Sequence, residues 1–234
     1  MPRSSASTHE TRPTYTVEDY LMTMHVMERD QGEIIAARLA EMLNVAPATV
    51  AMTLKRMERD NWITGTGRKA VHLTESGREA AYSVTRRHML TEWLLVSILK
   101  VPLPLIHSEA HGIEHAISPE LEERMRVVLG DPQVCPHGNP LPGREYVTIN
   151  WVPLTKTEVG ETVTIRRIHE FAEDNPELLN FLIKNGILPG TKAQVVSILP
   201  FNQTVTIQIS TESTTLGFAA AHFIFVERND KIAS

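Results

Sequence analysis

Residues 34–73 decide the fold of this chain, and they read IIAARLAEMLNVAPATVAMTLKRMERDNWITGTGRKAVHL. Apolar residues recur at helical spacing over 34–43 and again over 47–59, which predicts two short helices. The second helix begins with a proline, which suits a first turn because its missing N–H would have no partner there anyway. Two short apolar runs follow, at 62–64 and 70–73, with two glycines between them. These runs predict a β-hairpin.

Two helices joined by a tight break, followed by a hairpin with a basic tip, predict a winged helix-turn-helix that reads DNA. The N-terminal end of the second helix would enter the major groove and contact base edges. Residues 36–72 hold six Lys/Arg and three Asp/Glu, in a chain whose net charge is −5. Such a local positive excess favours phosphate binding. We expect base contacts from Pro47, Ala48, Thr49 and Met52, and phosphate contacts from Arg38, Lys55, Arg56, Arg68 and Lys69.

The composition of the whole chain is that of an ordinary globular protein. It has 234 residues, of which 42% are hydrophobic and 22% charged, so one or two domains with a real core are expected. A single cysteine excludes a disulfide framework and favours a reducing cytoplasm. No apolar run is long enough for a membrane span, and no membrane partner is expected. Residues 1–13 are polar and predict a disordered leader rather than a signal peptide.

The rest of the chain divides into a helical part and a strand-rich part. Residues 131–143 carry four prolines and two glycines, which predicts a linker or irregular loop between them. Helices are predicted at 17–29, 79–99, 105–116, 119–129 and 176–184, and strands at 163–165, 193–198, 204–209 and 222–226. The fold class is thus mainly α with β, ending in a small β-barrel. We predict a leader over 1–13, a DNA-binding domain over 14–80, a helical domain over 81–143 and the barrel domain over 144–234.

The helical domain carries a constellation of histidines and carboxylates. His107, His111, Glu114 and His115 fall on one face of a predicted helix, and His88 and Glu92 are four residues apart on the helix before it; Asp19 lies on the first helix. Histidine with Asp or Glu at such spacing is how helices present metal ligands. No HExxH motif and no nucleophile beside a base stands out, so we predict that the protein is not an enzyme.

Two further donors lie in the Pro/Gly-rich loop. Cys135 and His137 are two residues apart in a rigid frame, a compact chelating pair that could close on Glu92. The alternative is an ordinary turn with a free thiol. The helical domain also holds an apolar stretch, with Trp93, Leu94, Ile98 and Leu99, that is too broad for a lone surface helix and predicts a homodimer.

These residues resemble the diphtheria toxin repressor and manganese transport regulator family of metal-dependent repressors, over nearly the whole chain. The resemblance is strongest at Ile113-Glu114-His115, within the segment from His107 to His115. The other matching segments are Val17–Leu21, Pro47–Val50, Arg56–Asp60, Arg87-His88, Cys135–Pro140 and Leu188–Gly190. The resemblance implies a winged helix-turn-helix domain, a helical dimerisation and metal-binding domain, and a C-terminal FeoA-like barrel. It also implies a homodimer that binds a palindromic operator and represses metal-homeostasis genes when metal is plentiful.

The resemblance also assigns ligands. Asp19, His111, Glu114 and His115 match the family's primary metal site, with His88 close by. Glu92 and His107 match an ancillary site. In some members Cys135 and His137 join Glu92 there, with an acidic residue of the barrel for which Asp174 is our candidate. One or two ions per subunit are therefore expected.

The metal itself is open between Mn²⁺, which we favour, and Fe²⁺. Iron-type members carry methionine at the position of Asp19 and cysteine at that of His111. Manganese-type members carry aspartate at the first position but usually glutamate at the second, and some have a further glutamate where this chain has Met22. Oxygen and imidazole donors without a thiolate suit Mn²⁺ and also Fe²⁺.

Two alternative functions remain at this stage. One is a winged-helix regulator that senses an organic ligand, its histidines being incidental; metal-dependent DNA binding would separate it from a metal sensor. The other is a helical metalloenzyme with an accessory barrel, against which an intact recognition helix and wing argue.

Overall fold

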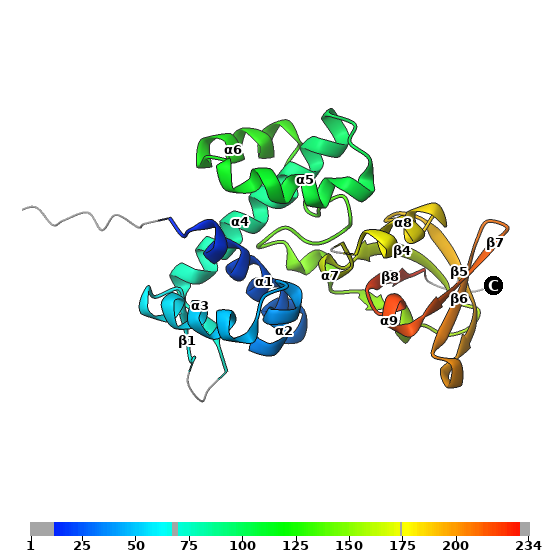
Figure 1. Ribbon diagram of the computed structural model, residues 1–234. Helices are drawn as coiled ribbons and strands as arrows, with labels where there is room; N and C mark the ends of the chain where they lie inside the picture. The colour runs from blue at the N-terminus through cyan, green and yellow to red at the C-terminus, as the bar shows by residue number, and fades with distance from the viewer. Residues whose placement is uncertain (1–11, 67–69, 174, 230–234) are drawn as a thin grey trace, which may run out of the picture. The chain divides into compact units, whose positions relative to one another are not determined.

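A computed structural model describes residues 12–66, 70–173 and 175–229 of the chain (Figure 1). The chain divides into two compact units, Met1–Val84 and Thr85–Ser234, called here the N-terminal and C-terminal units. No helix in these described ranges is both long enough and apolar enough to cross a bilayer. Most of the predicted leader, residues 1–11, lies outside the described residues. The boundaries of the three predicted domains stay a prediction.

The N-terminal unit contains the predicted helices and hairpin. Its elements are α1 (Tyr15–Gln31), α2 (Ala36–Met42), α3 (Pro47–Arg59), β1 (Ile63–Thr64), β2 (His72–Leu73) and the first part of α4 (Glu75–Trp93). The inward face of α3 is apolar, with Val50, Leu54 and Met57 all buried, as its spacing predicts. Thr74 caps α4 by accepting a hydrogen bond from the Gly77 N–H at 3.0 Å.

The helical part of the C-terminal unit begins with the second half of α4, which continues as a π-helical turn, Leu94–Ile98. A 3-10 turn (Leu103–Leu105), α5 (Ile106–Ile113) and α6 (Pro119–Val128) follow. The sequence predicts one helix over 105–116, and the predicted C-terminal end of that helix is wrong. The α-helix stops at Ile113, and Glu114–Ala116 form a tighter 3-10 turn. The end of a helix often tightens in this way because its last carbonyls have no partners one turn on.

The rest of the C-terminal unit is built on one antiparallel sheet of six strands in the order β3-β8-β4-β5-β6-β7. The strands are β3 (Trp151–Pro153), β4 (Thr162–Ile168), β5 (Lys192–Leu199), β6 (Thr204–Ile209), β7 (Glu212–Gly217) and β8 (Ile224–Arg228). Buried side chains from α8 (Pro176–Lys184), among them Leu179 and Leu182, pack into its core, as does Ala221 of α9 (Phe218–Ala221). Figure 1 shows α8 and α9 beside the strands.

The sheet is open, which corrects the prediction of a closed barrel. Within the described residues β3 and β7 are its two edges and share no ladder. Closure would need pairing along both edges, but β3 is only three residues long and ends in Pro153, which has no N–H to donate. The sequence analysis also missed β3, β7 and the short helices α7 (Glu170–Glu173) and α9. β7 is polar along its exposed positions and lacks a strong apolar run.

Candidate metal centre

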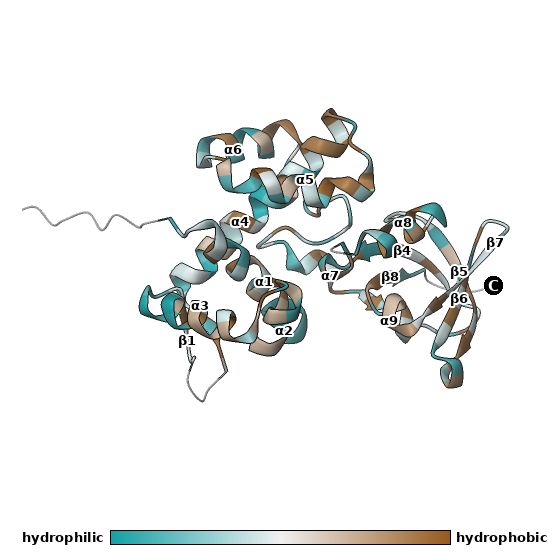
Figure 2. Cartoon of the chain, in the orientation of Figure 1, coloured by the Kyte–Doolittle hydropathy of each residue, from teal (hydrophilic) through white to brown (hydrophobic). Residues whose placement is uncertain are grey.

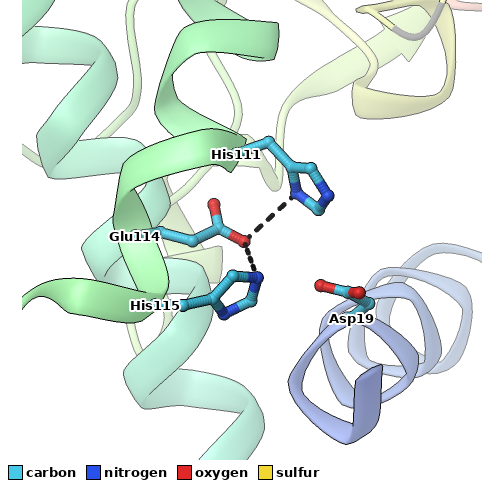
Figure 3. A group of neighbouring side chains, drawn as sticks. All are labelled: Asp19, His111, Glu114 and His115. Carbon is cyan, nitrogen blue, oxygen red and sulfur yellow. Dashed lines mark ion pairs between the residues drawn. The ribbon is translucent and has the colours of Figure 1, made fainter. Parts of the chain in front are cut away.

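Three of the predicted ligands gather at the C-terminal end of α5. His111 comes from the last turn of α5, and Glu114 and His115 come from the 3-10 turn after it. The Glu114 Oε1 atom lies 3.3 Å from His111 Nδ1 and 3.6 Å from His115 Nε2. Figure 3 shows the two imidazoles turned toward this one carboxylate. We call these three residues the first cluster.

Glu114 is fully buried, and the chemistry around it fits a cation. Burial by itself would raise its pKa, but the neighbouring imidazoles of His111 and His88 outweigh that effect and lower the pKa to about 2. Among the described residues, no donor is aligned to hydrogen-bond the buried Oε1 atom. An ionised oxygen without a hydrogen bond, facing two imidazoles, is a set of donors suited to a divalent metal. Asp19 belongs to α1 of the N-terminal unit, and its ligation of the same ion stays a prediction.

His88 on α4 uses both of its ring nitrogens. Its Nδ1 atom lies 2.5 Å from Glu114 Oε2, behind the first cluster. Its Nε2 atom lies 3.0 Å from His107 Nδ1 and 3.4 Å from Glu92 Oε1. The structure therefore groups His88 with Glu92 and His107, while its other nitrogen supports a ligand of the first cluster.

A second group of donors surrounds Glu92. His107 Nδ1 lies 3.5 Å from Glu92 Oε1 and 2.9 Å from Glu173 Oε2. The chelating pair of the loop meets the same carboxylates, because His137 Nδ1 lies 3.3 Å from each of those two oxygens. Cys135 shares a possible coordination group with Glu92 and His137. The second cluster thus consists of His88, Glu92, His107, Cys135, His137 and Glu173.

Most of the second cluster is buried, and its ionisable groups shift one another's pKa values. Glu92 and His137 are fully buried, and within the described residues neither Glu92 oxygen nor either His137 nitrogen has an aligned hydrogen-bond partner. Burial alone would lower the pKa of His88, but Glu114 and Glu92 raise it to about 9. Burial raises the pKa of the Cys135 thiol to about 12. Buried donors left without hydrogen bonds are costly, so this arrangement also fits a metal site.

The loop carrying Cys135 and His137 is held against the sheet by its backbone. The Ile168 N–H donates to the His137 carbonyl at 2.8 Å, and the Cys135 N–H donates to the Asn139 carbonyl at 2.8 Å. Gly138 has a φ of +91°, and a Cβ added there would lie 1.9 Å from the Arg166 carbonyl oxygen. Only glycine allows so close an approach of the loop to β4.

The carboxylate from the sheet region is one that the sequence analysis missed. Asp174, the predicted residue, lies outside the described residues. Its neighbour Glu173, in the last position of α7, supplies the oxygen that faces His107 and His137. Nothing in the local sequence singles out Glu173, because the direction of its side chain depends on partners far along the chain.

The predicted DNA-contacting residues lie at the surface of the N-terminal unit. Met52 is 73% exposed on α3, and the other candidates on α2 and α3 are exposed as well, namely Arg38, Pro47, Ala48, Thr49, Lys55 and Arg56. Glu58 accepts hydrogen bonds from the backbone N–H groups of Gly65 and Thr66, which ties the hairpin to α3. Arg68 and Lys69 lie outside the described residues. DNA contact by these side chains stays a prediction.

Three family models match consecutive parts of the chain. Residues 14–71 match the N-terminal DNA-binding domain of the iron-dependent repressors. Residues 74–143 match their metal-binding and dimerisation domain, and residues 152–228 match the FeoA domain. The three matches together extend over most of the chain.

Known proteins of similar sequence and structure are metal-dependent repressors. The iron-dependent repressor IdeR of Mycobacterium tuberculosis is 33% identical over 91% of this chain and 97% of its own length. The diphtheria toxin repressor of Corynebacterium diphtheriae is 32% identical over 77% of this chain and 84% of its own. A manganese-dependent transcriptional repressor solved in complex with manganese has a TM-score of 0.79 and is 30% identical, over 91% of this chain and 100% of its own.

Proposed function

The chain belongs to the family of metal-dependent transcriptional repressors that includes the iron-dependent repressors and the diphtheria toxin repressor, and from this premise we propose that a divalent metal ion in the first cluster switches its DNA binding on. The observation that carries the proposal is the buried, ionised Glu114, which faces His111 and His115 with one oxygen that has no aligned hydrogen-bond donor in the described part of the chain. The genes it represses would be those of metal homeostasis, in the cytoplasm.

Asp19 would complete the first site. It lies on α1 of the N-terminal unit, whereas the other ligands lie in the C-terminal unit. An ion that takes ligands from both units binds one arrangement of them more tightly than the others. By mass action it shifts the population toward that arrangement, which we propose is the one competent for DNA. This step is supported by the sequence position of Asp19 and by family membership.

We propose Mn²⁺ as the activating ion, with Fe²⁺ as the alternative. The first site would offer two carboxylates, Asp19 and Glu114, and two imidazoles, His111 and His115. Hard oxygen donors with some imidazole suit Mn²⁺, and the same set also suits Fe²⁺. Similar solved proteins are described with manganese, zinc or cadmium, so the family alone does not choose the ion.

The second cluster would bind a further ion per subunit. Glu92, His107, Cys135 and His137 supply the donors predicted for it, and Glu173 adds a further oxygen; Asp174, which lies outside the described residues, stays a prediction. Its donors come from α4, from α5, from the loop and from α7, so an ion there would hold the helical part and the sheet region together. The repressor would act as a homodimer on a palindromic operator, with two recognition helices about one turn of DNA or more apart.

The test of the switch is His115→Ala. DNA fragments selected from a random duplex library by the Mn²⁺-loaded protein serve as the operator. We expect the variant to remain a folded dimer and to lose metal-activated binding, while His222→Ala, which alters an exposed histidine, keeps it. Parallel anaerobic titrations with Mn²⁺, Fe²⁺ and Zn²⁺ at matched free concentrations rank the ions. Normal operator binding by His115→Ala would show that the site assignment is wrong, and activation at much lower Fe²⁺ than Mn²⁺ would reverse the ranking.

The second site is tested by metal content. The double variant Cys135→Ser, His137→Ala should lose one Mn²⁺ per subunit, because it removes two donors from around Glu92 and leaves the first cluster untouched. Unchanged stoichiometry in that variant would exclude these two residues as ligands.

A further inference from the structure

Asn139 is a buried amide that no proposed role accounts for. It follows the chelating pair in the loop, and its side chain is fully buried. The Nδ2 group donates to Glu173 Oε1 at 2.6 Å and to the Ile168 carbonyl at 2.8 Å. The Oδ1 atom accepts a hydrogen bond from Arg167 Nε. The amide therefore joins the loop to β4 and to the end of α7.

The orientation of this amide is forced by its neighbours. A guanidinium can only donate and a backbone carbonyl can only accept, so Oδ1 must face Arg167 and Nδ2 must face Ile168. The second N–H of the amide then donates to Glu173, so both N–H groups and the oxygen of the amide make hydrogen bonds. Aspartate has the same shape as asparagine but offers no donor at neutral pH, so it would face the Glu173 carboxylate with a second negative oxygen.

The arrangement divides the two oxygens of Glu173 between two tasks. Oε1 is held by Asn139, while Oε2 faces His107 Nδ1 at 2.9 Å and His137 Nδ1 at 3.3 Å. We propose that Asn139 is a positioning residue of the second cluster, which fixes Glu173 so that a single carboxylate oxygen is presented to the metal ion. This inference rests on the proposed second site. It also gives the C-terminal sheet a role, because β4 supplies Arg167 and the Ile168 carbonyl and α7 supplies Glu173; the amide nitrogen also lies 3.8 Å from Cys135 Sγ in the loop.

Arg167 holds Asn139 from the other side. A register shift in β4 between Ile165 and Arg167 accompanies the inward, 2% exposed position of this arginine. Its guanidinium also donates to Glu170 Oε2 at 2.9 Å and lies 4.9 Å from the centre of the Phe225 ring. A buried charge with these partners has little freedom to move. Outer groups of this kind orient metal ligands, and their loss typically weakens metal affinity about 10- to 100-fold.

The experiment measures Mn²⁺ binding by calorimetry in the His115→Ala background, in which the first site is disabled and the second remains. We expect Asn139→Asp to raise the Kd of the remaining Mn²⁺ about 10- to 100-fold, because the new carboxylate repels Glu173 and turns it away from His107 and His137. The matched control is Asn180→Asp, which makes the same change of charge at an exposed asparagine on α8. It should leave the Kd unchanged.

A purely structural role for Asn139 predicts a different result. It would lower the unfolding temperature of the metal-free protein and leave the Kd of the folded molecules unchanged, and that outcome would overturn the inference. If Asn139→Asp does not fold, Asn139→Ala removes the donor without adding charge and should weaken binding in the same direction. If the His115→Ala parent binds no Mn²⁺ at all, the second site itself fails and this inference with it. The switch at the first cluster is then judged separately by operator binding.

Discussion

At the scale of single residues, the candidate centre depends on side chains that have two partners. His88 contacts Glu114 with one ring nitrogen and Glu92 and His107 with the other. Glu173 is divided in the same way between Asn139 and the imidazoles. Because each nitrogen or oxygen can serve a different neighbour, a few buried residues link both clusters to the rest of the C-terminal unit.

Gly138 gives the sharpest prediction at this scale. Gly138→Ala should lower the free energy of unfolding by about 2–5 kcal/mol. Two costs add up: alanine disfavours the positive φ, and its Cβ would lie 1.9 Å from a backbone oxygen of β4. It should also remove the second metal ion, since the loop must leave β4. Gly143→Ala, with a φ of +83° and open space around its Cβ, should cost only about 1–2 kcal/mol and keep the ion. Chemical denaturation and metal analysis measure both effects; equal losses in the two variants would contradict the packing argument.

At the scale of elements, the proposed function depends on the end of α5 and on the exposed face of α3. The 3-10 turn after Ile113 places Glu114 in the interior, while His111 on the preceding α-helical turn keeps half of its side chain exposed. On α3 Val50, Leu54 and Met57 face inward, while Met52 and the basic residues Lys55 and Arg56 are left exposed for a partner. Each element therefore combines a packed face with a face that carries the proposed ligands or DNA contacts.

Lys55 and Arg56 on α3 should act as phosphate contacts. Replacing either with Ala should weaken binding to specific and random DNA alike, and should reduce the slope of log K against log salt by about 1. Arg59→Ala is the matched control, because Arg59 lies on the same helix but is already paired with Asp60 at 2.8 Å. Fluorescence anisotropy at several salt concentrations measures the slopes. A loss confined to one DNA sequence would instead indicate base contact.

At the scale of the whole molecule, an apolar surface is left on the helical part of the C-terminal unit. Ile98 is 55% exposed and Leu99 62%, and Val128 at the end of α6 is 74% exposed. In Figure 2 the segment between α4 and α5 is largely hydrophobic. Exposed apolar surface of this kind, within the region matched by a dimerisation domain, is expected to pack against a second copy.

The double variant Ile98→Glu, Leu99→Glu should therefore be monomeric. Burying two carboxylates at an interface is unfavourable, and a monomer reads only one half-site, so operator affinity should fall with the loss of the dimer. Sedimentation velocity at micromolar concentration with Mn²⁺ present reports the assembly state. The control, Val159→Glu with Phe201→Glu, changes two exposed apolar residues of the sheet region and should stay dimeric. If the Ile98→Glu, Leu99→Glu variant remained dimeric, the dimer interface would not include these two residues.

The local pattern of the sequence was enough for the N-terminal unit and for most of the donors. Helical spacing around Pro47 and the apolar runs beside Gly65 predict the two helices and the hairpin, because those elements are set by neighbours a few residues away. The spacing of His111, Glu114 and His115 likewise brings them together on a single segment.

The tertiary structure decided what depends on segments far apart in the chain. Three findings are of this kind. Glu173 is a carboxylate that faces His107 and His137, Asn139 hydrogen-bonds that carboxylate, and the sheet is open where a barrel was expected. The physical reason is that the direction of a buried side chain, and the pairing of an edge strand, are set by partners 30 or more residues away, such as Asn139 and Glu173. Periodicity within one element contains no information about such partners.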